Sequence, residues 1–142
     1  IGIGGIFSES DNANQLWNQV VEGKTMKHLS QIKGSSFAYG SVREMYQEAY
    51  MEKVGLTEQE YTSMNRQQKL IFNALGQAMV ENNISVAALS AIPTGVFIAA
   101  QQVFQKDADE SKASDYDKYF SYLIPNKISF QLNLEGPSEV VN

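Results

Sequence analysis

The sequence predicts an α/β protein in which helices cover a sheet, although the strands are too few to complete a layered domain. Apolar runs typical of strands occur at residues 1–7 and 94–100, and residues 70–79 between them repeat apolar side chains at helical spacing. The run at residues 94–100 is apolar on both faces, as in a strand covered by helices on both sides. Alternating strands and helices favour layered α/β packing.

The first elements are expected to be a short buried strand at residues 1–7 and a polar turn at residues 8–12. A helix should follow, because four apolar side chains recur at helical spacing: Leu16, Trp17, Val20 and Val21. Gly23 stands where this helix should end. The glycines near the start do not form a dinucleotide-binding motif, because Phe7 occupies the place of its third glycine.

The next stretch, residues 24–40, shows little periodicity, and Gly34-Ser35-Ser36 indicates a loop. Residues 41–53 are rich in helix formers and predict a second helix. One face of that helix would carry Val42, Met45, Tyr46 and Ala49.

Two helix starts are marked by capping-box spacing, the first by Thr57 with Glu60 and the second by Asn65 with Gln68. The second start opens the clearest helix of the chain, which should end near Asn82-Asn83. Its apolar stripe consists of Leu70, Ile71, Ala74, Leu75, Ala78 and Met79.

After the strand at residues 94–100, residues 105–118 are dense in charged and polar side chains and predict a solvated loop. Residues 120–134 are ambiguous. They alternate like a strand at Ile128, Phe130, Leu132 and Leu134, and they repeat every four residues like a helix at Phe120, Ile124, Ile128 and Leu132. Gly136-Pro137 then turns the chain, and an apolar run begins at Val140-Val141.

Composition narrows the class of protein. The 142 residues suffice for one modest domain, and 43% hydrophobic with 19% charged residues is typical of globular proteins. The net charge of -5 argues against a nucleic-acid partner. Without cysteine the chain has no disulfide, cysteine-ligated zinc or thiol catalysis, and the cytoplasm is the default location. No run is long and apolar enough to cross a membrane, and none predicts a signal peptide.

Four separated segments resemble, in order, the β-ketoacyl synthases (ketosynthases) of fatty-acid and polyketide synthesis. Residues 1–5, with Asn14-Gln15-Leu16-Trp17 and Glu22-Gly23-Lys24, are similar to the family's first strand and helix. Residues 64–70 resemble its Met-Asp-Pro-Gln-Gln-Arg-Leu, with Asn65 and Arg66 in place of Asp and Pro. Residues 94–98 match its second strand. Residues 126–129 and 134–138 resemble its Asn-Arg-Ile-Ser and Leu-Arg-Gly-Pro-Ser.

The resemblance spans nearly the whole chain and leans toward the modular polyketide type, although residues 25–53 match poorly. It implies that residues 1–142 form the N-terminal part of one ketosynthase domain with a thiolase-like layered α/β/α/β/α fold. It also favours the helix for residues 120–134, with Pro125 in the first turn, where a missing N–H is tolerated. The strand stays the alternative.

The resemblance implies an activity whose catalytic groups this chain does not contain. Ketosynthases use a cysteine thiolate and two histidines, and the cysteine follows the Gly-Pro-Ser turn almost at once. Here the sequence reaches Asn142 before any cysteine, so we expect a piece of a longer protein that is inactive alone. His28 lies in the poorly matching region without acidic or cysteine neighbours, so no catalytic residue is assigned. No metal or cofactor is expected.

The resemblance places a substrate tunnel near the two-fold axis of a homodimer, after the second strand and at the start of the following helix. The corresponding residues are Gln101, Gln102, Phe104, Tyr119, Phe120 and Ile124. Phe104 and Phe120 would touch the acyl chain, or they simply fill the core. The implied partners of the parent enzyme are acyl thioesters and an acyl carrier protein. Two alternatives stay open: a non-catalytic subunit of the chain-length-factor type, and a free-standing small binding domain.

Overall fold

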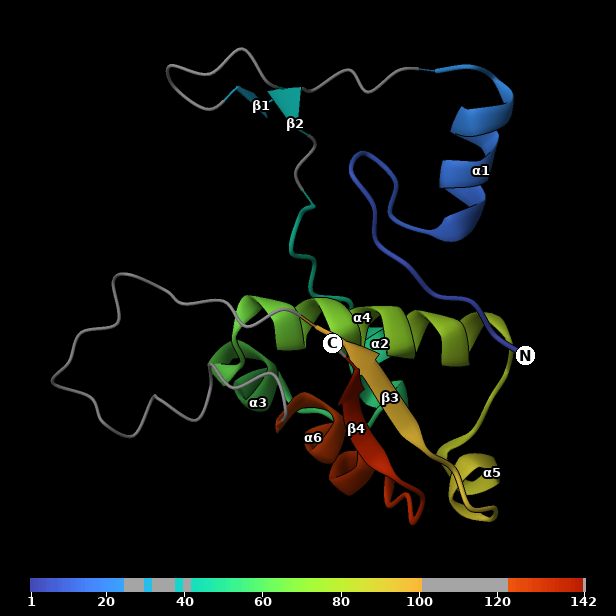
Figure 1. Cartoon of the computed structure of the whole chain (residues 1–142), viewed down its shortest axis with the longest axis vertical. Coiled ribbons are helices and arrows are strands. Elements are labelled where there is room, and N and C mark those ends of the chain that lie inside the picture. The colour runs from blue at the N-terminus through green and yellow to red at the C-terminus, as the bar shows by residue number, and fades with distance from the viewer. Residues whose placement is uncertain (25–29, 32–37, 40–41, 101–122, 142) are drawn as a thin grey trace, which may run out of the picture.

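The computed structural model describes residues 1–24, 30–31, 38–39, 42–100 and 123–141. Helices and short strands alternate within these ranges. In chain order they are α1 (Ala13–Val21), β1 (Ser30–Gln31), β2 (Ala38–Tyr39), α2 (Glu48–Lys53), α3 (Glu58–Ser63), α4 (Arg66–Glu81), α5 (Val86–Ser90), β3 (Val96–Ala99), α6 (Leu123–Leu132) and β4 (Ser138–Val141). In Figure 1 the elements from α2 onward form one body around α4, while α1, β1 and β2 stand apart from it.

Both predicted capping boxes are present. At the start of α4, the Asn65 side chain accepts the Gln68 backbone N–H at 2.9 Å, and the Gln68 side chain accepts the Asn65 N–H at 3.2 Å. Thr57 and Glu60 form the same exchange at the start of α3. Helix α4 ends at the Asn82 cap, followed by Asn83 with a φ of 51°. The predicted bounds of α4 are therefore confirmed.

The buried face of α4 differs from the predicted stripe. Of the six stripe residues only Met79 is buried, and the other buried positions are Gln68, Phe72, Asn73, Gly76 and Gln77. Part of this face packs against α2, where Gly76 admits the backbone of Tyr50, whereas Gln77 contacts the N-terminal segment. The other five stripe residues are half-buried, and four of them lie on the side that faces β3 and α6, namely Ile71, Ala74, Leu75 and Ala78. Periodicity alone misplaced the face because Asn73 and Gln77 are polar, yet both find hydrogen-bond partners inside.

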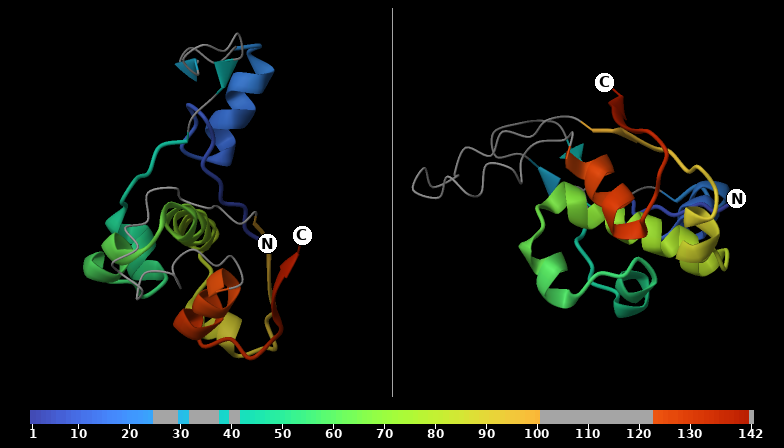
Figure 2. Two further views of the ribbon diagram at one scale, coloured as in Figure 1. Left: turned by 60° about the vertical axis from the view of Figure 1, so that its left-hand side comes forward. Right: turned by 90° about the horizontal axis from the view of Figure 1, so that it is seen from below.

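The strands β3 and β4 pair in parallel, with Val96 opposite Ser138 and Ala99 opposite Val141. Figure 2 shows α4 and α6 on one side of this pair. Val96 and Ile98 face that side and pack against the core cluster. Phe97 on the opposite face is 59% exposed. The predicted strand is confirmed, but within the described residues only one of its faces is covered.

The ambiguous segment contains helix α6, as the resemblance implied. Its buried residues recur along one face: Ile124, Pro125, Ile128 and Leu132. Pro125 lies in the first turn, and Asn133, with a φ of 51°, follows the last turn. Phe130, which the strand pattern would have buried beside Ile128, is 86% exposed. A strand would place Phe130 on the same face as the buried Ile128 and Leu132, so the exposure of Phe130 distinguishes the helix from the strand.

The expected buried strand at residues 1–7 is wrong. This segment forms only an isolated bridge between Phe7 and Ser10, and Ile1 and Ile3 are exposed. Its backbone runs along α4, where a Cβ on Gly4 would lie 1.9 Å from the Ala74 carbonyl oxygen. A strand needs a backbone partner, whereas the N–H of Gly5 donates to a side chain of α4.

Helix α1 is confirmed at its predicted place. Gly23 follows its last turn with a φ of 64°, a backbone conformation that glycine adopts without strain. None of the residues of α1 is buried, and Trp17 is 65% exposed. The sequence therefore predicted the helix and its end, but its apolar face has no cover among the described residues.

The helix predicted over residues 41–53 is shorter in the structure. Helix α2 begins only at Glu48, and residues 42–47 have no regular structure. The carbonyl oxygens of Val42 and Met45 accept hydrogen bonds from Arg66 and Tyr61 instead of from a helical turn. The antiparallel pair of β1 and β2, with Ser30 opposite Tyr39, was not predicted. The predicted loops at Gly34-Ser35-Ser36 and at residues 105–118 lie outside the described residues.

No helix in the described ranges is both long and apolar enough to cross a membrane.

Candidate functional site

The parallel ladder of β3 and β4 has Ala99 opposite Val141 as its last described pair. Because the strands are parallel, both run toward the same edge. In open α/β sheets, the carboxyl ends of parallel strands are where ligands and catalytic groups gather. This edge is the candidate site, and Figure 1 shows β3 and β4 pointing toward it side by side.

Most of the predicted tunnel residues lie outside the described part of the chain. Gln101, Gln102 and Phe104 follow β3 in sequence, and Tyr119 and Phe120 precede α6. Ile124 is described. It lies in the first turn of α6, is 1% exposed and belongs to the core cluster. Its role toward a substrate stays a prediction.

The turn that leads into β4 is fastened to β3 by backbone hydrogen bonds. The Gly136 N–H donates to the Thr94 carbonyl at 3.1 Å, and the Val96 N–H donates to the Pro137 carbonyl at 2.7 Å. A Cβ on Gly136 would lie 2.3 Å from the Thr94 carbonyl oxygen, so only glycine allows this approach. The turn therefore fixes the register of β4 against β3.

Helix α6 holds the same strand from the other side. The hydroxyl groups of Ser129 and Ser138 share a hydrogen bond, and the Leu134 N–H donates to the Ser129 carbonyl at 2.8 Å. Ser138 is the first residue of β4. The position from which β4 starts is thus set by both β3 and α6.

A hollow of about 480 Å³ lies between α4 and the inner face of the strands. Its apolar side chains come mainly from the predicted stripe of α4 and from β3, including Ile71, Leu75, Val96 and Ile98. These side chains are half-buried, so the hollow is open. None of the described residues that line it is charged, so these residues offer space for apolar groups and no acidic or basic side chain.

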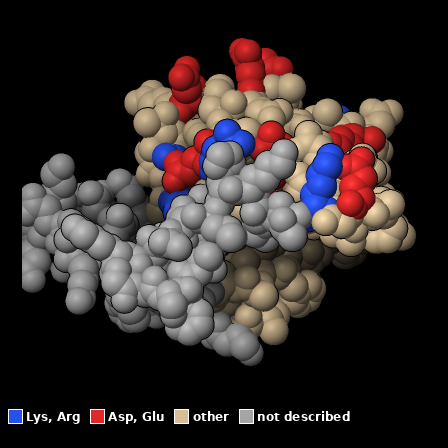
Figure 3. All heavy atoms as spheres, turned by 90° about the horizontal axis from the view of Figure 1, so that it is seen from above, with Lys and Arg blue, Asp and Glu red and all other residues tan. Residues whose placement is uncertain are grey.

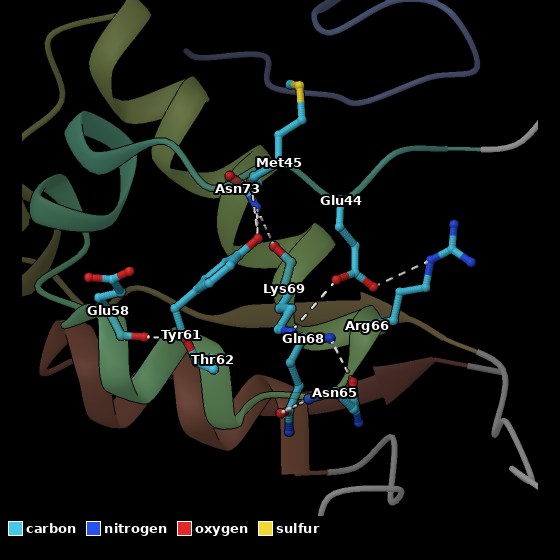
Figure 4. A network of polar contacts seen from close by, with 10 residues as sticks. All are labelled: Glu44, Met45, Glu58, Tyr61, Thr62, Asn65, Arg66, Gln68, Lys69 and Asn73. Atoms are coloured by element: carbon cyan, nitrogen blue, oxygen red, sulfur yellow. Dashed lines mark hydrogen bonds and ion pairs between the residues drawn. The ribbon is translucent and has the colours of Figure 1, made fainter. Parts of the chain in front are cut away.

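A polar cluster fastens residues 42–47 to α3 and α4 (Figure 4). The Tyr61 hydroxyl donates to the Met45 carbonyl at 3.0 Å and accepts from the Asn73 amide at 2.8 Å. Glu44 pairs with Lys69 at 3.6 Å and with Arg66 at 3.8 Å. Partial burial raises the pKa of Tyr61, against the lowering effect of the Asn73 hydrogen bond. The hydroxyl therefore stays protonated and donates, which suits a structural tie.

The described residues contain no constellation for metal binding or nucleophilic catalysis. No group of histidine, aspartate and glutamate side chains among them could hold a metal ion, and the sequence has no cysteine. His28 lies outside the described residues. In the view from above Figure 1, the described residues show acidic and basic side chains interspersed, without a basic stripe of the kind that follows a phosphate backbone (Figure 3).

The sequence matches one protein family, described as Beta-ketoacyl synthase, N-terminal domain, over residues 1–142. Polyketide synthase PksR of Bacillus subtilis (strain 168) is 28% identical over 98% of the chain and 6% of its own length. Polyketide synthase PksN of the same organism is 24% identical over 100% of the chain and 3% of its own length. The fatty acid synthase of Anser anser anser is 23% identical over 96% of the chain and 42% of its own length. The chain thus spans less than half of each relative.

A solved structure shares the fold. It is the ketosynthase from module 1 of the bacillaene synthase from Bacillus amyloliquefaciens FZB42, with a TM-score of 0.63 and 21% identity. The match covers 100% of this chain and 28% of that one. The predicted fold class, an N-terminal part of a thiolase-like α/β fold, is therefore confirmed.

Sequence reasoning missed the polar side chains that face inward from α4, namely Asn73 and Gln77. Both are 2% exposed, and they lie four residues apart along one side of α4. The sequence gives only a weak indication of this side, namely two uncharged amides four residues apart, Asn73 and Gln77, with Gly76 next to the second. The wider apolar stripe on the same helix indicated a different buried face.

Proposed function

The chain belongs to the β-ketoacyl synthase family, and from this premise we propose that it is the N-terminal segment of a ketosynthase. The parent enzyme would join an acyl thioester to a malonyl-type extender held by an acyl carrier protein, in polyketide or fatty-acid synthesis. The family match over residues 1–142 carries the proposal. The relatives named as polyketide and fatty acid synthases support the reaction class, transfer of acyl groups. A cytoplasmic location stays a prediction.

The geometry of β4 supports a role in placing a nucleophile. A thiolate is favoured where a strand meets the N-terminus of a helix, because the helix dipole stabilises negative charge there. Strand β4 follows the Gly-Pro-Ser turn and is fastened by Thr94, Val96 and Ser129. A cysteine carried just beyond such a strand would be held at a fixed position, as nucleophilic catalysis requires.

The segment alone should take up no acyl group, because it contains no cysteine. We expect intact-mass spectrometry after incubation with an acyl thioester to show an unchanged mass. The same assay on the chain extended through the downstream reading frame to the end of the ketosynthase domain should show one added acyl group. Stoichiometric acylation of residues 1–142 would contradict the proposal.

A non-catalytic subunit of the chain-length-factor type is the second candidate. The family match over residues 1–142 fits it equally, because such a subunit would have the same N-terminal fold. The extended chain separates the two candidates. A cysteine soon after Asn142 that becomes acylated supports the enzyme, whereas glutamine, serine or glycine there, with no acylation, supports the subunit.

We also propose that the parent protein is a homodimer. The resemblance to ketosynthases supports the dimer. Separately, the described residues leave the outer face of the β3–β4 pair uncovered, with Phe97 and Val141 59% and 53% exposed. Residues 1–142 alone should therefore self-associate, as measured by analytical ultracentrifugation. Phe97→Ser should reduce this association. Phe130→Ser, which removes an exposed ring on α6, serves as the control. A monodisperse monomer at all concentrations would count against the surface.

The substrate tunnel is proposed for residues around the carboxyl edge of β3: Gln101, Gln102, Phe104, Tyr119, Phe120 and Ile124. The sequence neighbourhood supports it, because Gln101 to Phe104 follow β3 directly. In the complete parent enzyme, Phe120→Ala and Phe120→Trp should shift chain-length selectivity in opposite directions, by about 0.8 kcal/mol per methylene accommodated or excluded. Phe130→Ala is the control. Unchanged selectivity with lower stability would show that Phe120 only fills the core.

A further inference from the structure

The N-terminal unit, residues 1–23, consists of a segment that runs along α4, a turn, and helix α1 with its cap. Helix α1 contributes no buried residue. Figures 1 and 2 show it standing away from the body that α4 and the strands form. Burial of α1 therefore does not decide where this unit sits, and another contact must place it.

The side chain of Gln77 makes such a contact. It projects from α4 and is 2% exposed. Its Oε1 accepts the backbone N–H of Gly5 at 2.7 Å, and its Nε2 donates to the backbone carbonyl of Asp11 at 2.9 Å. The buried amide of Gln77 thus bonds the Gly5 N–H before the turn and the Asp11 carbonyl after it. These are backbone groups that a neighbouring strand would otherwise bond.

The turn is braced internally by two glutamines of α1. Gln19 donates to the Glu9 carbonyl at 2.9 Å and accepts from the Ser10 hydroxyl at 3.0 Å. Gln15 accepts the Asp11 N–H at 2.8 Å. Because these bonds tie the turn to α1, an anchor on the turn also fixes the helix.

We infer that Gln77 is a positioning residue, which we call the latch, and that it holds the N-terminal unit on α4. Loss of the latch releases this unit locally while the body stays folded. The body has its own core, formed by residues such as Met51, Phe72 and Leu132, which lies apart from the turn. Local release of this kind is expected where a segment contributes few buried apolar side chains.

The amide chemistry of the latch is specific. A methionine at position 77 has a similar length and helix propensity but neither hydrogen bond. A glutamate keeps an acceptor for Gly5 and, when ionised, places an oxygen instead of a donor against the Asp11 carbonyl. Gln77→Met therefore removes both hydrogen bonds, whereas Gln77→Glu removes only the one to Asp11.

The test is amide hydrogen exchange of the whole chain by NMR, with Gln77→Met, Gln77→Glu and the exposed-site control Gln59→Met. We expect the Gly5 amide to exchange at least about tenfold faster in Gln77→Met, and by a smaller factor in Gln77→Glu. Amides of residues 70–81 should keep their rates in both. Fluorescence anisotropy of Trp17, the single tryptophan, should fall in Gln77→Met and stay constant in Gln59→Met.

Three results would overturn the latch. If the Gly5 amide and the α4 amides accelerate equally, or if both variants unfold the chain, Gln77 is a core residue of the body. If neither the Gly5 rate nor the Trp17 anisotropy changes, the unit is held by other contacts.

Discussion

Phe72→Ala is expected to lower the free energy of unfolding by about 3–5 kcal/mol, the cost typical of emptying a fully buried phenylalanine site. Phe72 is 0% exposed and lies on the face of α4 that packs against α2. Its neighbours in the core cluster include Met51 and Val54, which are also fully buried. Surroundings packed this closely collapse only partly onto a cavity, so most of the lost packing remains lost.

The matched control is Leu75→Ala on the same helix. Leu75 belongs to the predicted stripe but lines the open hollow and is only half-buried. It should cost roughly 1–2 kcal/mol, because part of the side chain already contacts solvent. Urea denaturation of both variants measures the difference. A larger loss for Leu75 than for Phe72 would mean that the predicted stripe, and not the α2-facing side, is the buried face of α4.

Gly76→Ala should destabilise the chain by about 1–3 kcal/mol, the usual cost of overpacking a core. A loss of stability would be informative, because replacing glycine by alanine inside a helix otherwise raises the free energy of unfolding by about 1 kcal/mol. A Cβ at position 76 would lie 2.6 Å from the carbonyl oxygen of Tyr50 and 2.7 Å from its Cβ. The obstacle includes the backbone of α2, so relief requires the two helices to separate.

Gly23→Ala is the control, because it introduces backbone strain without a steric clash. Gly23 also disfavours a side chain, through its φ of 64°, but a Cβ there meets no atom within 4 Å. We expect a loss of about 1 kcal/mol from the left-handed conformation, with the α2–α4 packing intact. Thermal unfolding followed by circular dichroism compares the two. Stabilisation by Gly76→Ala would show that α2 and α4 do not approach as closely as the structure has them.

Local patterns predicted the elements whose determinants lie within a few residues. The capping pairs at Thr57 and Asn65 located the starts of α3 and α4, because a cap bonds groups only three residues away. Gly23 marked the end of α1 for the same local reason. The resemblance resolved residues 120–134, where periodicity alone left helix and strand equal.

For the candidate site, the sequence predicted the Gly-Pro-Ser turn and the strand after it, and both are present as the start of β4. It could not predict the register of β4 against β3, because that register arises from backbone hydrogen bonds of Gly136 and Pro137 to Thr94 and Val96, which are distant in sequence. The residues expected to contact substrate lie mostly outside the described ranges, so their roles rest on the resemblance.

By itself, then, the sequence determined the family, the helix caps and the order of the elements, because these depend on neighbouring residues and on a recognisable series of motifs. Only the tertiary structure decided which face of α4 is buried and how residues 1–7 lie. Both were decided by contacts between residues far apart in sequence: the backbone of α2 against Gly76, and the N-terminal segment against the Ala74 carbonyl and the Gln77 side chain. At such contacts a polar side chain can be buried, because it forms a hydrogen bond with a backbone group that would otherwise lack a partner. The spacing of hydrophobic residues in the sequence does not indicate where this happens.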